Sequence, residues 1–442
     1  MDIPLTAPLK VVETTIEGNN LTRVDTIERQ LQGLYNASTL QGVADQAVKA
    51  ADRLEGLGIF ENVELELLPG KHRGEAGLRV SVKEKRVTSL KVSTFVQQGE
   101  GGVEFTTRAS NALGRAEVLE VTALMGGSEV KGTPRRTQLR CDYSQPTFFG
   151  LPASLSVSGD STSFQPVGEN TFEDVSYGVA VRLKSRFGLD FEWIARQRDI
   201  MPSRRVMNKE DTTGVLTYAA PAEIVADARP SMKSALSVQY AIDGLLPNSQ
   251  FPLVGSAAAL RMEIASPQIT GGNVDLFALS GKLKQAFPLS NEVSLTASLE
   301  TSMVRPLSGD YVHIQDRLFL GGPMFLRGFH PRGAGPRSSD GTASLGGRNR
   351  WQVRIGIEGP PPDWTRLPSA ARAHIFAAAG GISNEANLEH LFKKDVRLSV
   401  GCGLAFSIAS ARLEANAVYV LKADKNDATS GRLQFGLGAE FL

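Results

Sequence analysis

The chain has 442 residues and is nearly neutral, with 48 lysines and arginines against 47 aspartates and glutamates. This balance excludes the strongly basic surface that nucleic-acid binding requires, so no nucleic-acid partner is expected. The length suits a small domain followed by a large one. No stretch reaches the roughly 17–25 mostly apolar residues of a transmembrane helix, so hydropathy alone would miss a membrane protein built from strands.

The residues that usually form catalytic and metal sites are scattered along the chain. The five histidines lack the spacing of a zinc motif, and neither a G-x-S-x-G nucleophile motif nor a phosphate-binding loop is present. Cys141 and Cys402 have no His or Cys neighbour at ligand spacing. We therefore expect no enzymatic activity, no metal and no cofactor.

Residues 1–87 predict a compact α+β domain. Apolar residues recur at spacings of three and four after Thr22, which is expected to cap the first helix, and again after Ser38. The expected elements are a strand at 10–17, helices at 22–35 and 38–54, and strands at 59–68 and 78–85. The first residues contain neither the basic nor the apolar region of a secretory signal peptide, which weighs against a bacterial outer-membrane protein.

From Ser89 to the end of the chain the helical period disappears and apolar residues alternate with polar ones. The runs last about 9–14 residues, which exceeds most soluble strands and suffices to cross a bilayer at a tilt. About sixteen such runs over residues 88–442 predict an all-β membrane protein, a transmembrane β-barrel, with the weakest assignments at residues 200–230. In the last run, Leu433, Phe435, Leu437 and Phe441 share the apolar face, and Gln434 and Glu440 the polar face.

Other all-β architectures fit this pattern less well. A soluble sandwich with so many long strands would be unusual, and no 40–50-residue repeat of a propeller is present. Cys141 and Cys402 both fall on the apolar phase of separate strands, so both are expected to face lipid without forming a disulfide.

The connection over residues 306–348 is far longer than a hairpin loop, which points to a functional loop. Its segment 320–329 combines Leu320, Met324, Phe325, Leu326 and Phe329 with one charged residue, Arg327, in a density that disordered loops rarely reach. A loop that folds into the barrel would need such packing residues, together with an arginine able to bond a carboxylate at two points.

This loop carries a family resemblance. Gly321-Gly322-Pro323 followed by Arg327-Gly328-Phe329 resembles the signature of the sixth extracellular loop in the outer-membrane barrel-assembly insertases. The form with Leu-Gly-Gly-Pro is most similar to the barrel subunit of the mitochondrial sorting and assembly machinery, as are residues 232–237, 271–274 and 434–442. The N-terminal unit resembles one polypeptide-transport-associated (POTRA) domain, the number typical of the mitochondrial form.

The resemblance implies specific roles for a few residues. Arg327, Gly328 and Phe329 would insert into the barrel and brace strands that follow the loop, and Glu358, on the inward phase of the next strand, is the expected partner of Arg327. Bacterial relatives place a further acidic residue just before a glycine on the following strand, but here residues 377–380 read Ala-Ala-Ala-Gly.

The implied function is an insertase that folds β-barrel precursor proteins into the mitochondrial outer membrane. Its partners would be these precursors, the other subunits of the machinery and the lipid bilayer. A lateral gate would open between the first strand, with Ser89, Leu90 and Val92, and the last, with Gln434, Gly436 and Phe441. A two-partner-type secretion pore and a metabolite-conducting porin remain as alternatives.

Overall fold

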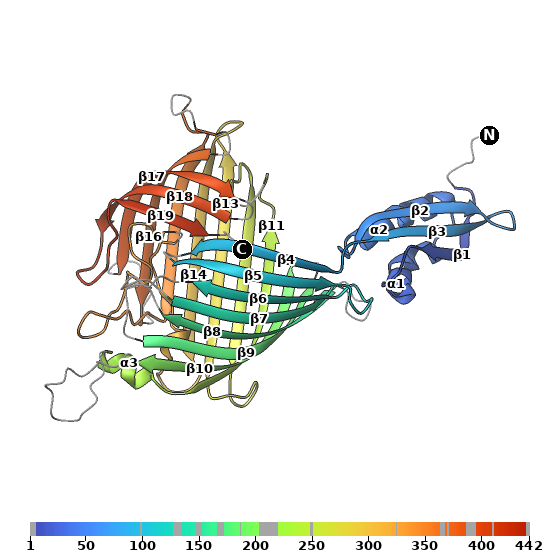
Figure 1. Cartoon of the computed structure of the whole chain (residues 1–442). Coiled ribbons are helices and arrows are strands. Elements are labelled where there is room, and N and C mark those ends of the chain that lie inside the picture. Colours follow the sequence, from blue (N-terminus) through green and yellow to red (C-terminus); the bar gives the residue numbers. More distant parts are fainter. Residues whose placement is uncertain are drawn as a thin grey trace.

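The computed structural model describes most of the chain. The described residues are 6–97, 100–126, 135–146, 153–165, 172–185, 187–202, 220–247, 251–323, 325–362, 367–368, 371–385, 395–408 and 411–438. They form two bodies, a small α+β domain at the N-terminal end and a large sheet rolled into a barrel (Figure 1). None of the described helices is long and apolar enough to cross a membrane.

The small domain, called the POTRA-like domain below, has the predicted element order. Its central strand is β3, which pairs in parallel with β1 and antiparallel with β2. The two helices pack against this sheet through fully buried leucines such as Leu31, Leu34 and Leu54. The elements are β1 (Lys10–Glu17), α1 (Val24–Tyr35), α2 (Leu40–Glu55), β2 (Phe60–Pro69) and β3 (Glu75–Glu84).

The predicted cap of the first helix is wrong. Helix α1 has Arg23 at its N-cap, without a side-chain cap, and Thr22 lies one residue further out. The Thr22 hydroxyl donates to the Glu84 carboxylate at 2.5 Å instead. In α2, by contrast, the Thr39 hydroxyl accepts from the backbone N–H of Gly42 at 3.1 Å, the usual geometry of a capping residue.

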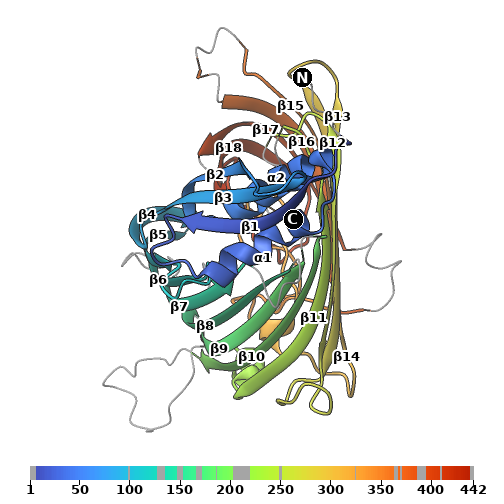
Figure 2. The same cartoon turned by 90° about the vertical axis from the view of Figure 1, so that its right-hand side faces the viewer.

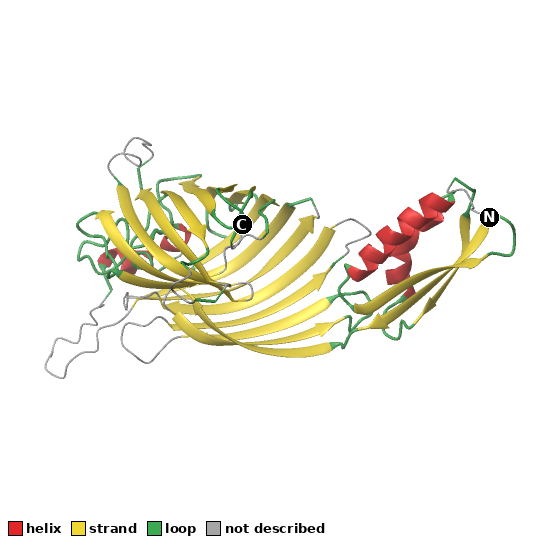
Figure 3. Cartoon of the chain, turned by 90° about the horizontal axis from the view of Figure 1, so that it is seen from above, coloured by secondary structure: helices red, strands yellow, loops and turns green. Residues whose placement is uncertain are grey.

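The large sheet has sixteen strands, and every neighbouring pair is antiparallel and consecutive in sequence, from β4 to β19. This confirms the predicted barrel and its strand number (Figures 1 and 3). The strands are β4 (Thr88–Gln97), β5 (Glu100–Ser110), β6 (Val118–Gly126), β7 (Arg135–Gln145), β8 (Ala153–Gln165), β9 (Phe172–Ser185), β10 (Leu189–Pro202), β11 (Ser231–Asp243), β12 (Gly255–Ala265), β13 (Leu276–Pro288), β14 (Ser294–Pro306), β15 (Asn349–Gly359), β16 (Ala371–Ser383), β17 (Val396–Ile408), β18 (Ala411–Lys422) and β19 (Leu433–Gly438).

The two faces of the barrel wall follow the predicted alternation. Leu433 and Phe435 are about two-thirds exposed on the outside, whereas Gln434 between them is buried inside. The free thiols of Cys141 and Cys402 are exposed on β7 and β17, as expected for residues that face lipid. The side chain of Leu437 and all of Glu440 and Phe441 lie outside the described residues.

The weakest part of the sequence prediction, residues 200–230, contains a short helix. Strand β10 ends at Pro202 and β11 begins at Ser231, and between them the structure describes α3 (Ala222–Asp227). Ile224 of this helix is fully buried in a cluster with Phe172 and with Ile314 of the long loop. The helix therefore forms part of a cap over the barrel end where the long loop begins.

Candidate functional site

The long loop joins β14 to β15 and packs against the inner faces of the last strands. Leu326 and Phe329 are fully buried in one cluster with Phe376 and Ile382 of β16 and Val418 of β18. Side chains of the loop and side chains of the strands therefore share one core.

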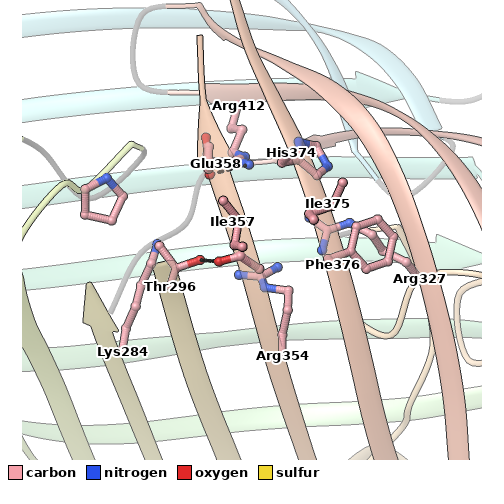
Figure 4. A pocket seen from close by; sticks show the side chains of 12 residues that line it. Lys284, Thr296, Arg327, Arg354, Ile357, Glu358, His374, Ile375, Phe376 and Arg412 are labelled. Atoms are coloured by element: carbon pink, nitrogen blue, oxygen red, sulfur yellow. Dashed lines mark hydrogen bonds and ion pairs between the residues drawn. The ribbon is translucent and has the colours of Figure 1, made fainter. Parts of the chain in front are cut away.

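Arg327 lies at the centre of this contact. Only 2% of its side chain is exposed, and its Nε and Nη2 donate to the two carboxylate oxygens of Glu414 at 2.9 and 2.7 Å. Its guanidinium carbon lies 4.6 Å from the ring centroid of Phe376, a cation–π distance (Figure 4). This two-point bond requires an arginine, because a lysine ammonium has no planar pair of donors.

Glu358 is not the partner of Arg327, and that part of the prediction is wrong. Glu358 accepts from Nη1 of Arg412 at 3.0 and 3.1 Å, and Nε of Arg412 donates to Glu414 at 2.6 Å. The four side chains form a network of alternating charge, Arg327, Glu414, Arg412 and Glu358, that runs from the loop across β18 to β15. Figure 4 shows the part of it between Arg412 and Glu358. Because the loop crosses to β18, its arginine meets a strand distant in sequence.

Every charged side chain in this four-residue network lies beside a side chain of opposite charge. Such pairing is required because the four side chains are buried. The Glu414 carboxylate is fully buried and accepts from both arginines and from Nδ2 of Asn416 at 2.9 Å. Nε2 of His374 in turn donates to Oδ1 of Asn416 at 2.7 Å. Removing one member of such a network leaves an uncompensated buried charge, which is far more costly than the pair is worth in isolation.

Glycines in β17 make room for this network. A Cβ on Gly401 would lie 2.7 Å from the Phe376 ring, and one on Gly403 would lie 2.2 Å from Oδ1 of Asn416. The two side chains that approach β17 most closely at these glycines are therefore Phe376 and Asn416.

Gly328 and Gln434 connect the loop to the last strand. The backbone N–H of Gly328 donates to Oε1 of Gln434 at 2.9 Å, and Nε2 of Gln434 donates to the carbonyl of Phe329 at 3.0 Å. Gly328 has a φ of +88°, and a Cβ there would lie 2.7 Å from Cγ2 of Val420. Both the conformation and the space therefore require glycine at this position.

The Leu-Gly-Gly-Pro segment forms the bend that precedes the arginine. Gly321 and Gly322 have φ values of +115° and +116°, and the N–H of Gly322 donates to the Phe329 carbonyl at 3.2 Å. Pro323 is buried next to them. These residues set the path of the loop backbone, and the charge of the motif comes from Arg327.

The first half of the loop is fixed to the opposite part of the wall. Asp316 is 3% exposed and accepts from Arg198 of β10 at 2.8 Å and from Lys233 of β11 at 2.7 Å. Lys233 also pairs with Glu263 of β12 at 2.6 Å. The loop is thus bonded to β10 and β11 at one end and to β18 and β19 at the other.

The expected gate residues lie on the two end strands of the sheet. β4 and β19 are neighbours, but among the described residues no paired positions join them. Leu90 and Val92 are exposed on β4, Ser89 is exposed near its start, and Gly436 is buried on β19 beside Gln434. Phe441 lies outside the described residues.

Fold and site together define a class of protein: a membrane β-barrel with a POTRA-like domain and a long loop folded inward onto the last strands. The part of the chain that the structure describes holds no group of three or more His, Cys, Asp or Glu residues that could bind a metal ion. The chain belongs to the Omp85 superfamily, because the model of the Omp85 superfamily domain matches residues 111–441. The proteins of this family are not enzymes.

Curated relatives are similar over nearly the whole chain. The sorting and assembly machinery component 50 homolog A of Xenopus laevis is 26% identical, covering 96% of this chain and 89% of that protein. The homolog of Homo sapiens is 25% identical, with coverage of 96% and 89%. A SAM50-like protein of Schizosaccharomyces pombe is 24% identical over 99% of this chain and 92% of its own length. The predicted type, a β-barrel of the mitochondrial outer membrane, is confirmed.

Solved structures show the same fold. BamA from Haemophilus ducreyi lacking POTRA domains 1–3 has a TM-score of 0.77 at 16% identity, covering 97% of this chain and 85% of that one. CdiB from Acinetobacter baumannii has a TM-score of 0.57 at 13% identity, covering 98% and 73%. At these identities the likeness concerns the fold alone.

Proposed function

We propose that this protein folds β-barrel precursor proteins and inserts them into the mitochondrial outer membrane through a lateral gate between β4 and β19. Membership in the Omp85 superfamily and similarity to sorting and assembly machinery components support an assembly role. Its partners would be the precursors, the other subunits of that machinery and the lipid bilayer.

The end strands of the sheet are suited to such a gate. Among the described residues, paired positions join β19 to β18 over Leu433–Gly438, and none join β19 to β4. A strand edge with unpaired backbone groups is a template for another strand, and in lipid every backbone group needs a partner. A precursor strand that adds to β4 or β19 would receive its hydrogen bonds without passing through lipid unpaired.

The observation that carries the proposal is the loop's attachment to one side of this seam. Arg327 bonds Glu414 of β18, and Gln434 of β19 bonds the backbone at Gly328 and Phe329. These contacts hold the last two strands from inside, while the loop is bonded to β10 and β11 on the other side of the barrel. The gate would therefore open by movement of β4 away from a fixed β19.

Precursor folding in liposomes tests this function. An unfolded barrel precursor is added to liposomes with and without the purified protein, and the folded fraction is followed by heat-modifiable gel mobility. We expect faster folding with the protein, and no acceleration for a precursor whose terminal strand is scrambled. Equal rates with and without the protein would refute the proposal, and a steady open conductance in planar bilayers in that case would favour a porin.

A further inference from the structure

The POTRA-like domain is attached to the barrel at two places. The first is the chain itself, because β3 leads into β4 through residues 85–87. The second is the turn of residues 111–117 between β5 and β6, called the β5–β6 turn below, which lies against α1 on the same barrel end (Figures 1 and 2). A domain attached by one linker can rotate, whereas one attached at two separate points on adjacent strands cannot.

The contact at the turn is a set of hydrogen bonds, of which those made by Asn111 and by the Thr26 hydroxyl are buried. Nδ2 of Asn111 donates to the Thr22 hydroxyl at 2.8 Å, and both residues are nine-tenths or more buried. The Gly114 carbonyl accepts from the backbone N–H of Arg23 at 2.9 Å and from the Thr26 hydroxyl at 2.9 Å. Nε of Arg23 donates to the Leu113 carbonyl at 3.1 Å. A buried hydrogen bond in this contact stabilises it more than an exposed one, because water does not replace the lost partner of a buried group.

Apolar packing joins the same two parts. Ala116 of the turn is fully buried in the core of the POTRA-like domain, together with Leu31, Val43 and Leu78. The barrel therefore contributes a side chain to the small domain's own core. A domain joined to the barrel by a flexible linker alone would have a core made only of its own residues.

The turn is held in a strained conformation that suits this contact. Asn111 and Ala116 have φ values of +60° and +59°, which non-glycine residues rarely adopt, and Gly114 has +78°. Inside the turn, Oδ1 of Asn111 accepts from the N–H of Ala116 at 2.9 Å, and the Glu117 carboxylate accepts from the N–H of Arg115 at 2.9 Å. Such strain persists only where the surrounding contacts fix it, and it is concentrated at sites with a function.

We propose that the β5–β6 turn is a latch that fixes the POTRA-like domain on the barrel and thereby positions β4, with Asn111 as its positioning residue. The inference rests on the proposed function, since β4 is one edge of the gate. The POTRA-like domain and the strands β4, β5 and β6 move as one body. When a precursor or another subunit moves the small domain, β4 moves with it, and the seam between β4 and β19 changes.

The test measures the orientation of the small domain in the full-length protein in lipid nanodiscs. Spin labels are placed at Val48 on α2 and at Phe187 in the β9–β10 turn, both well exposed, after Cys141 and Cys402 are replaced by serine. Asn111→Gly keeps the positive φ and removes the side-chain bonds, and Thr22→Val removes only the hydroxyl. Asn291→Gly in the exposed β13–β14 turn is the matched control.

We expect one narrow interspin distance in the starting protein and in the Asn291→Gly control, and a broad distribution in both latch variants. Precursor folding in liposomes should fall severalfold in the latch variants, while barrel folding, read by heat-modifiable mobility, stays intact. An unchanged narrow distance in Asn111→Gly and Thr22→Val would overturn the latch. Broadened distances with unchanged precursor folding would overturn its role in positioning β4.

The proposed function and the latch can fail separately. If the starting protein does not accelerate precursor folding, the insertase proposal falls, and the spin-label distances still decide whether the latch exists. If Asn111→Gly fails to fold, Thr22→Val carries the test, because it preserves the turn residue and the shape of the side chain it replaces.

Discussion

Arg327 is the single side chain whose removal should affect the site most. It is almost fully buried and bonds both oxygens of Glu414. Arg327→Ala leaves that carboxylate with one arginine fewer, and breaking a buried pair from one side costs about 3–5 kcal/mol. We expect a loss of this size in the barrel's free energy of unfolding and a strong loss of precursor folding. Arg327→Lys should recover only part of both, because lysine cannot make the planar two-point bond.

A second loop arginine provides the control for this prediction. Arg348 pairs with Asp310, whose side chain is 92% exposed, so Arg348→Ala should change stability by no more than about 1 kcal/mol. Equal losses for Arg327→Ala and Arg348→Ala, measured by urea unfolding in detergent, would contradict the role of the buried network.

A double-mutant cycle should separate the two candidate partners of Arg327. Because Arg327 touches Glu414 directly, the pair Arg327→Ala and Glu414→Ala should show a coupling energy of about 1–3 kcal/mol. Glu358 reaches Arg327 only through Arg412 and Glu414, so Arg327→Ala and Glu358→Ala should couple more weakly. A larger coupling with Glu358 would restore the partner that the sequence suggested.

The sequence identified the arginine of the site but not its acid. The motif around Arg327 stands out because residues 320–329 combine glycines and apolar residues with a single charge. Glu414 was missed because loop and strand are 87 residues apart, and the choice of Glu358 assumed contact with the next strand along the chain. Arg412, Glu414 and Asn416 do alternate with Leu413, Ala415 and Ala417, a polar inner face that could have pointed to this strand.

At the scale of elements, the loop depends on a glycine that lies against β18. In Gly328→Ala the new methyl group meets Val420 at a φ of +88°, which combines crowding with a left-handed backbone. Each effect costs roughly 1–3 kcal/mol, so precursor folding and barrel stability should both fall. Adding Val420→Ala removes the closest of the new contacts but not the backbone strain, and should restore stability only in part. Full recovery, or no effect of the first change, would contradict the observed geometry.

The start of helix α1 gives the POTRA-like domain a dependence on pH. Burial raises the pKa of the Glu84 carboxyl, but hydrogen bonds from Thr22 and Leu21 outweigh it and leave the pKa below its ordinary value of 4.5. A lowered pKa in the folded state means that the carboxylate stabilises the domain above pH 4.5 and that this stability is lost as the pH falls further.

Thermal unfolding of the POTRA-like domain within the full-length protein in detergent, followed by the far-UV signal of its helices between pH 7 and pH 3, measures this effect. We expect the melting temperature to fall below pH 4.5 and the fall to be smaller in Glu84→Gln. Glu66→Gln is the control, because its side chain is 62% exposed in a surface ion pair with Arg79. Identical pH profiles for Glu84→Gln and the unchanged domain would contradict the prediction.

At the scale of the molecule, alternation of side chains was enough to predict the barrel and its sixteen strands, because each strand shows one face to lipid and one to the interior. The alternation did not predict the structure of residues 200–230. The apolar residues of α3 there pack against the long loop and do not alternate between lipid and the barrel interior. The joint at the β5–β6 turn could not be predicted either. Its residues bond partners almost 90 positions away, and alanine as a residue type does not indicate the positive φ that Ala116 adopts.

The central claim is that a precursor strand enters between β4 and β19, and site-specific crosslinking tests it most directly. After Cys141 and Cys402 are replaced by serine, one cysteine is introduced on β4 as Ser89→Cys, or on the inner face of β8 as Ser158→Cys. A precursor with one cysteine in its terminal strand is then added to liposomes under oxidising conditions. We predict a disulfide with Ser89→Cys that requires an intact terminal strand, and none with Ser158→Cys. Equal crosslinking at both positions, or none at Ser89→Cys while the precursor still folds, would contradict the lateral gate.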